Sequence, residues 1–133
     1  MVSTASYEAR PYGVHSAMPS STAKRLCPHA IWTHGRFDRY REMSNAIMEI
    51  LRAETPHVQQ VSIDEAFMTC LPRREPRASR ARGPAHPERV AALGVTCSIG
   101  VGTSKSVAKI ASDRDKPRGL TVVFPGTEAA FLE

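Results

Sequence analysis

The chain lacks long hydrophobic runs and has few cysteines. None of its 133 residues lies in a run near the roughly 20 apolar residues that a membrane-spanning helix needs. The first residues, MVSTASYEAR, lack the charged and apolar regions of a secretory signal. Cys27, Cys70 and Cys97 are an odd number and have no CxxC or Cys/His ligand spacing. These absences argue against a membrane protein, a disulfide framework and a zinc site, and they favour a reduced, cytoplasmic location.

The length and charge of the chain bound its class. At 133 residues it has the length of one domain with a single modest core. Its formal net charge is +5, from 18 basic and 13 acidic side chains. A basic chain favours a partner that carries phosphates, but many soluble domains are basic without binding nucleic acid. The charge therefore indicates a class of partner without identifying one.

Apolar spacing predicts helices that alternate with strands, which indicates an α/β or α+β layer rather than a bundle. The clearest element is a helix in RFDRYREMSNAIMEILRAET, where apolar residues recur on one face until Pro56. The runs HVQQVSI and AFMTC predict a hairpin with its tip at Asp64 and Glu65. The other expected elements are a short helix over 6–12, a turn at Gly13, a helix over 19–26, a strand over 30–33, a strand over 94–102, a helix over 103–116 capped by Thr103 or Ser104, a strand over 119–124 and a helix that begins within 125–133.

Residues 71–91, LPRREPRASRARGPAHPERVA, differ in composition from both flanks. Four prolines and six arginines fall in this stretch, which has almost no apolar face. Prolines at that density cannot sit inside a helix. We therefore expect an exposed, flexible basic loop, with a short helix after Pro87 as an option.

Two adjacent acids, Asp64 and Glu65, interrupt the apolar residues of the expected hairpin, among them Val61, Ile63 and Phe67. Burying two ionised neighbours is costly unless a cation neutralises them. Mg²⁺ binds carboxylate oxygens and leaves room for phosphate oxygens, and two such ions can clamp a phosphoryl displacement. A turn with two solvated acids at its tip is the simpler alternative, and the dipeptide alone leaves both interpretations open.

Other stretches carry groups that could contact phosphate. Tyr7 and Arg10, in YEARPYG, would share one face of a helix and could both donate to a phosphate, unless the arginine is an incidental surface residue. Lys116, in DRDKPRGL, is either a ligand or a solvated charge at a helix end. GVGTSKS is not a phosphate-binding P-loop, because that pattern needs Gly immediately before the Lys and Ser104 stands there.

The order of these stretches along the chain resembles one family. TASYEARPYGVHSAMP, YREMSNAIMEILRAETPHVQQVSIDEAF and VTCSIGVGTSKSVAKIASDRDKPRGLTVV fall, in this order, within roughly residues 4–19, 29–68 and 93–124. Together they resemble the Y-family, or translesion, DNA polymerases of the DNA polymerase IV (DinB-like) type. Such collinear agreement is highly specific.

The resemblance implies an α+β fold, with an incomplete ferredoxin-like palm sheet, packed helices and a small helical fingers segment. It assigns residues 1–30 to the fingers-like segment and residues 31–124 to the incomplete palm. Within the palm, residues 71–91 are the Pro/Arg-rich flexible loop, and residues 125–133 start a following helix.

The resemblance also implies the site. In the family the Ser-Ile-Asp-Glu-Ala hairpin lies in the palm, which implies that Asp64 and Glu65 bind Mg²⁺ and that Glu65 is catalytic. The family uses two such ions. The residues implied for nucleotide binding are Thr4, Tyr7, Arg10 and Lys116.

The implied activity is template-directed, Mg²⁺-dependent nucleotidyl transfer by an error-prone DNA polymerase. It belongs to translesion synthesis and DNA repair after DNA damage, where such an enzyme is a mutator. The implied partners are a DNA primer-template and a deoxynucleoside triphosphate (dNTP).

The chain departs from the family pattern in three places. It has no hydrophobic-Asp-x-Asp strand, it has Thr69 where the family usually has another Asp, and it stops where the thumb would begin. We therefore expect an incomplete palm-and-fingers portion, without the N-terminal catalytic strand, the thumb and the little finger. Besides the family function, two alternatives stay open: an inactive truncated remnant that binds nucleic acid weakly, and one piece of a split polymerase whose partner chain supplies the missing strand and thumb.

Overall fold

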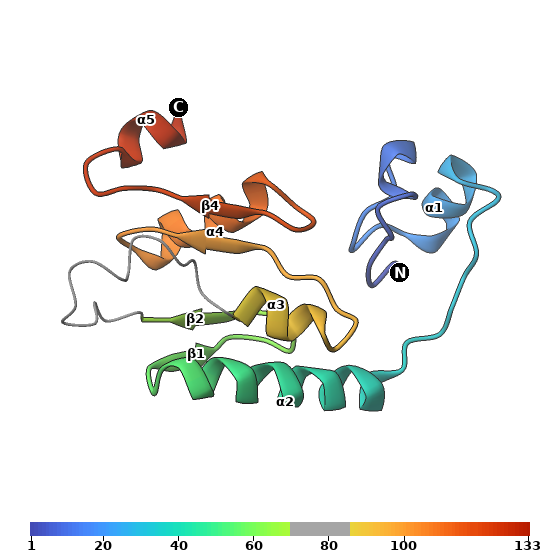
Figure 1. Ribbon diagram of the computed structural model, residues 1–133. Helices are drawn as coiled ribbons and strands as arrows, with labels where there is room; N and C mark the ends of the chain where they lie inside the picture. Colours follow the sequence, from blue (N-terminus) through green and yellow to red (C-terminus); the bar gives the residue numbers. More distant parts are fainter. Residues whose placement is uncertain (70–85) are drawn as a thin grey trace. The chain divides into compact units, whose positions relative to one another are not determined.

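Helices precede a strand hairpin, and helices then alternate with short strands, in a computed structural model that describes residues 1–69 and 86–133 (Figure 1). The chain divides into two units, Met1–Arg36 and Phe37–Glu133, each described below by itself. No helix in the described ranges is both long and apolar enough to cross a membrane. Most of the predicted basic loop, residues 71–85, lies outside these ranges.

The unit Met1–Arg36 is built around a small apolar cluster. It contains a short 3₁₀ helix, η1 (Arg10–Tyr12), and one α-helix, α1 (Ser20–Leu26). The chain closes on itself where Val2 N donates to Met18 O at 2.9 Å and Ala17 N donates to Val2 O at 2.9 Å. The buried residues of the cluster are Val2, Val14, Met18, Ala23 and Cys27.

The predicted helix over 6–12 is shorter than expected. Ser6 O accepts from both Ala9 N and Arg10 N, which forms a turn, and only residues 10–12 continue as η1. Gly13 then ends η1 with a φ of +80°, a conformation that glycine adopts without steric cost. The turn at Gly13 and the helix over 19–26 are confirmed, whereas the strand over 30–33 is wrong, because those residues pair with no strand in the described ranges.

In the second unit, the long helix α2 (Phe37–Glu54) runs beside a hairpin (Figure 1). The hairpin pairs β1 (Val58–Gln60) with β2 (Ala66–Met68) in antiparallel register, with Gln59 opposite Phe67. Gln60 Nε2 donates to Ser44 Oγ on α2 at 3.4 Å, which ties the two elements together. Both the helix and the hairpin are therefore confirmed.

A β-α-β unit follows in the chain. α3 (His86–Ala91) precedes β3 (Ile99–Val101), α4 (Lys105–Arg114) and β4 (Leu120–Val122), and β3 pairs with β4 in parallel. Val107 and Ala111 of α4 bury against Val123, beside α5 (Glu128–Leu132). Of the two predicted caps for α4, Ser104 is the one formed, since its Oγ accepts from Val107 N at 3.3 Å.

Two details of the unit Phe37–Glu133 differ from the sequence-based expectation. The end of the expected loop is helical, because α3 already begins at His86, before Pro87. Val61 and Ile63 are 55% and 43% exposed, because they lie in the turn of the hairpin and not in its strands. In the described residues the strands form two separate pairs, so the fold is mixed helix with small sheets.

Candidate functional site

The turn of the β1–β2 hairpin carries the two predicted acids. Val61 N and Ser62 N both donate to Glu65 O, at 2.9 and 3.2 Å, and close the turn. Ser62 Oγ donates to Asp64 Oδ1 at 2.6 Å, which orients this exposed carboxylate. The prediction that the hairpin tip lies at the acid pair is confirmed, and Asp64 and Glu65 follow each other on a solvent-facing turn. We call Ser62, Asp64 and Glu65 the acidic turn.

The acidic turn is joined to α4 by an ion pair. Lys109 Nζ donates to Glu65 Oε1, and the two side chains are 41% and 44% exposed. The hydrogen bond to Glu65 raises the pKa of Lys109, and the charges of Glu65, Asp113 and Asp64 add to this effect against a partial desolvation. Lys109 therefore places a positive charge close to the carboxylates of Asp64, Glu65 and Asp113.

A second lysine of α4 contacts the strands of the hairpin. Lys105 Nζ donates to Gln59 Oε1 on β1 and lies 5.8 Å from the ring centroid of Phe67 on β2. Lys105 and Lys109 are four residues apart, so both lie on the same side of the helix. This side of α4 faces the hairpin.

Lys116, the predicted triphosphate ligand, lies just beyond the end of α4. Its Nζ forms an ion pair with Asp113 Oδ1 at 2.6 Å. The hydrogen bond from Lys116 lowers the pKa of Asp113, with further lowering by the charges of Lys116 and Lys109 against some desolvation. Asp113 thus fixes where the ammonium of Lys116 lies.

The donor set of the acidic turn fits Mg²⁺ in part. The described residues hold no group of three or more His, Cys, Asp or Glu side chains arranged around a common metal position. Mg²⁺, however, is commonly bound through one or two carboxylates and completes its shell with water and substrate phosphates. Asp64 and Glu65 supply two carboxylates on an accessible turn, which matches that partial set.

The other predicted ligands lie in the unit Met1–Arg36. Arg10 Cζ lies 4.3 Å from the centroid of the Tyr7 ring, and Arg10 Nε donates to Ala5 O at 3.2 Å. Thr4, three residues before Tyr7, is also exposed. The turn and η1, not the predicted shared face of a helix, bring Tyr7 and Arg10 together.

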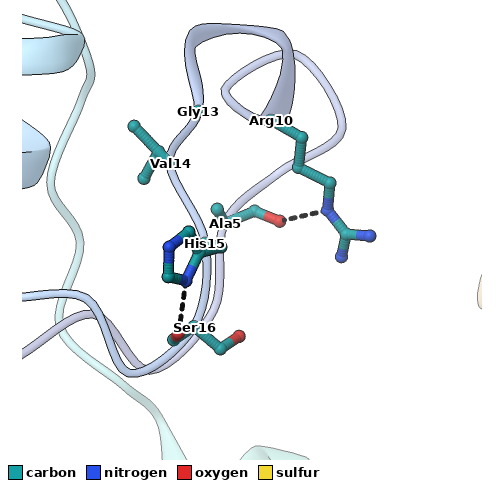
Figure 2. A pocket seen from close by; sticks show the side chains of 6 residues that line it. All are labelled: Ala5, Arg10, Gly13, Val14, His15 and Ser16. Carbon is teal, nitrogen blue, oxygen red and sulfur yellow. Dashed lines mark hydrogen bonds between the residues drawn. The ribbon is translucent and has the colours of Figure 1, made fainter.

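Arg10 also lines a pocket of about 460 Å³. Figure 2 shows its Nε directed at the Ala5 carbonyl and the two terminal guanidinium nitrogens turned away from it. His15 Nδ1 lies 2.8 Å from the backbone O of the next residue, Ser16, which also lines the pocket. The lining residues are Ala5, Arg10, Gly13, Val14, His15 and Ser16.

The structure thus groups the predicted residues in two sets, one in each unit. Asp64, Glu65 and Lys116 belong to Phe37–Glu133, and Thr4, Tyr7 and Arg10 belong to Met1–Arg36. The sequence analysis missed Lys109 and Asp113, which pair with Glu65 and Lys116. The spacing of Lys105, Lys109 and Asp113 was a possible signal, since residues four apart on a helix share a side.

Known proteins match this chain along its whole length. A family model described as the impB/mucB/samB family matches residues 1–113. DNA polymerase IV of Streptomyces coelicolor is 44% identical over 137 residues, an alignment that covers 100% of this chain and 29% of that protein. DNA polymerase IV of Listeria monocytogenes serotype 4a is 44% identical over 135 residues, covering 100% of this chain and 38% of that protein.

Solved structures match the fold. An insertion ternary complex of Dbh DNA polymerase superimposes with a TM-score of 0.79 at 31% identity, covering 98% of this chain and 38% of that chain. A DinB family error-prone DNA polymerase from Sulfolobus solfataricus gives 0.79 at 30% identity, covering 99% and 40%. Both the fold and the sequence thus match Y-family DNA polymerases, which confirms the resemblance noted from the motifs.

The chain belongs to the impB/mucB/samB family, whose model covers 113 of its 133 residues. It spans 29–38% of the length of the two DNA polymerase IV relatives described above.

Proposed function

We propose that this chain supplies the metal-binding hairpin and the triphosphate ligands of an error-prone DNA polymerase. The reaction is template-directed, Mg²⁺-dependent nucleotidyl transfer to a DNA primer end during translesion synthesis. The observation that carries the proposal is the solvent-accessible acid pair on a hairpin turn, in a chain that aligns over its whole length with DNA polymerase IV. In this proposal residues 1–30 act as fingers and residues 31–124 as a ferredoxin-like palm.

The acidic turn has the role of holding the cation. Asp64 and Glu65 would bind Mg²⁺, which supplies positive charge against the triphosphate oxygens when bound. Ser62 orients the Asp64 carboxylate through the 2.6 Å hydrogen bond, so this carboxylate need not be ordered at the moment of binding. Glu65 is proposed as the catalytic carboxylate beside the cation.

Thr4, Tyr7 and Arg10 are proposed to bind the triphosphate from the first unit. The Tyr7 ring and the Ala5 carbonyl hold the guanidinium of Arg10 in place. Its two terminal nitrogens can then donate to phosphate oxygens with less loss of side-chain entropy. Tyr7 and Thr4 add hydroxyl donors.

Lys116, in the second unit, is proposed to bind triphosphate as a point charge. Its present partner, Asp113, is half exposed, so a phosphate can compete for or share the ammonium. We propose turnover on a primer-template only when further polypeptide is present, equivalent to the rest of the relatives' length. The same chain or a partner chain would supply it.

The test is calorimetric titration of the chain with a dNTP, with and without Mg²⁺. We expect Mg²⁺ to tighten binding, and we expect the double variant Asp64→Asn, Glu65→Gln to lose this dependence, because the neutral amides keep the shape of the turn but bind the cation poorly. A matched control is Asp38→Asn, Glu42→Gln on the exposed side of α2, which removes the same charge elsewhere.

The outcomes separate the proposal from its alternative. Equal dNTP binding with and without Mg²⁺ by a folded chain contradicts the proposed metal site. Loss of the Mg²⁺ dependence in the control variant would show an effect of net charge alone. A folded chain that binds DNA weakly but no dNTP would instead support an inactive domain of polymerase origin.

A further inference from the structure

One side of α4 connects both groups that the proposed function assigns to the second unit. Lys109 Nζ donates to Glu65 Oε1, a contact between residues 44 positions apart in the sequence. One turn further along α4, Asp113 Oδ1 accepts from Lys116 Nζ at 2.6 Å. Because Lys109 and Asp113 are four residues apart, they lie on the same side of the helix. A single rigid element therefore holds the acidic turn at one point and Lys116 at another.

We propose that Lys109 is a positioning residue, which fixes the Glu65 carboxylate relative to Lys116. The cation bound by Glu65 and the triphosphate bound by Lys116 are then held at a fixed distance and orientation. This inference rests on the proposed function, since it concerns how that site is assembled. Lys109 binds Oε1 of Glu65, which leaves the second carboxylate oxygen, Oε2, to face a cation.

Stability alone is a weak reason for this ion pair. Both side chains are more than 40% exposed, and ion pairs between exposed groups contribute little to the free energy of folding. The contact does, however, restrict the rotamers of a carboxylate on a turn that would otherwise be anchored only through the hairpin. Groups that orient a metal ligand commonly change metal affinity when they are removed.

Lys105 provides an internal comparison. It lies one turn before Lys109 on the same side of α4 and carries the same charge. Its contacts are with the neutral Gln59 and the Phe67 ring on the strands of the hairpin. A change at Lys105 therefore removes a charge and a helix-to-hairpin contact without touching the Glu65 carboxylate.

The experiment measures how strongly Mg²⁺ tightens dNTP binding to the full chain, as the ratio of the affinities with and without Mg²⁺. We expect Lys109→Met to lower this ratio roughly ten-fold, the size of effect typical for a group that orients a metal ligand. Lys109→Arg, which can still donate to Glu65, should restore most of it. Lys105→Met should leave the ratio unchanged. Circular dichroism and the thermal midpoint report whether each variant is folded, and Lys109→Gln replaces Lys109→Met if the latter does not fold.

Each outcome decides a different point. An unchanged ratio in folded Lys109→Met overturns the positioning role and leaves the proposed function in place. A higher ratio also overturns it, because Lys109 would then compete with the cation for Glu65. No Mg²⁺ dependence in the wild-type chain overturns the proposed function itself, and the inference with it.

Discussion

At the scale of single residues, each of three charged groups assigned to the second unit is already held by a neighbouring side chain. Ser62 donates to Asp64, Lys109 donates to Glu65, and Lys116 donates to Asp113. These contacts reduce the number of orientations that the groups sample before a ligand arrives. The residues named by the sequence are therefore ordered by residues that the sequence analysis did not name.

The pairing of Asp113 with Lys116 predicts a pH-dependent contribution to stability. Lys116 lowers the pKa of Asp113 below its ordinary value of 3.8. A carboxylate with a lower pKa in the folded chain stabilises the fold above pH 3.8, and this contribution is lost as the pH falls from there through the folded-state pKa. We expect Asp113→Asn to lower the free energy of unfolding at neutral pH by about 0.2–1 kcal/mol, since the pair is largely exposed.

Urea unfolding at a series of pH values from neutral to acidic measures this effect. The difference between wild type and Asp113→Asn should shrink as the solution becomes more acidic than pH 3.8. In a Lys116→Met background the same substitution should have little effect at any pH. A difference that stays constant across the series would show that Asp113 stabilises the chain by a route other than this ion pair.

At the scale of elements, the position of α4 depends on its close approach to β3. A Cβ added at Gly100 would meet the backbone of α4 itself, at Ala108 O and Ser112 N. Backbone atoms in the middle of a helix cannot move aside as a flexible side chain can. The absence of a side chain at Gly100 therefore allows α4, which carries Lys109 and Asp113, to lie close against β3.

We expect Gly100→Val to destabilise the chain by about 1–3 kcal/mol or more, because the larger side chain must push α4 away from β3. Chemical denaturation measures the loss. Gly94→Asn is the matched control: nothing lies within 4 Å of the added Cβ there, and asparagine tolerates the φ of +78°. Equal losses in both variants would contradict the close approach as the cause.

Gly100→Val should also weaken Mg²⁺-dependent dNTP binding if the chain still folds, since Lys109 moves with α4. The same calorimetric ratio described for Lys109→Met reports this coupling between an element and the site.

At the scale of the whole chain, the net charge of +5 predicts weak and salt-sensitive DNA binding. Non-specific binding of a basic protein to DNA has a Kd of about 10⁻⁴–10⁻⁶ M at physiological salt and weakens linearly on a log–log plot as salt rises. Fluorescence anisotropy of a labelled primer-template, titrated at several salt concentrations, measures both quantities. Binding that does not change with salt would contradict a phosphate-based interaction.

The variant with a neutral acidic turn makes a second prediction about DNA binding. Asp64→Asn, Glu65→Gln removes two negative charges, so it should bind DNA at least as tightly as the wild type while losing Mg²⁺-dependent dNTP binding. Opposite changes in the two affinities would separate general attraction to phosphates from recognition at the site. A parallel loss of both would indicate that the variant is misfolded.

Local patterns were enough to predict many of the elements. The spacing of apolar residues predicted α2, and two strand-like runs with the acids at their junction predicted the hairpin with its acidic tip. The strand expected over 30–33 failed because apolar composition indicates a strand only where a partner strand is available, and Ile31 is 91% exposed. Likewise, two competing caps for α4 were equally good in sequence, and only the backbone geometry selected Ser104.

The sequence by itself determined the family and the periodic helices, and it supplied the residue types of the proposed site, because each of these depends on neighbours in the chain or on collinear motifs. Only the tertiary structure decided that Lys109 pairs with Glu65 and that α4 lies against Gly100. These contacts join residues that are not neighbours in the sequence, and their formation depends on how α4 packs against β3 and β4 and reaches the hairpin through its lysine side chains. No local pattern encodes that packing, which is a property of the folded unit as a whole.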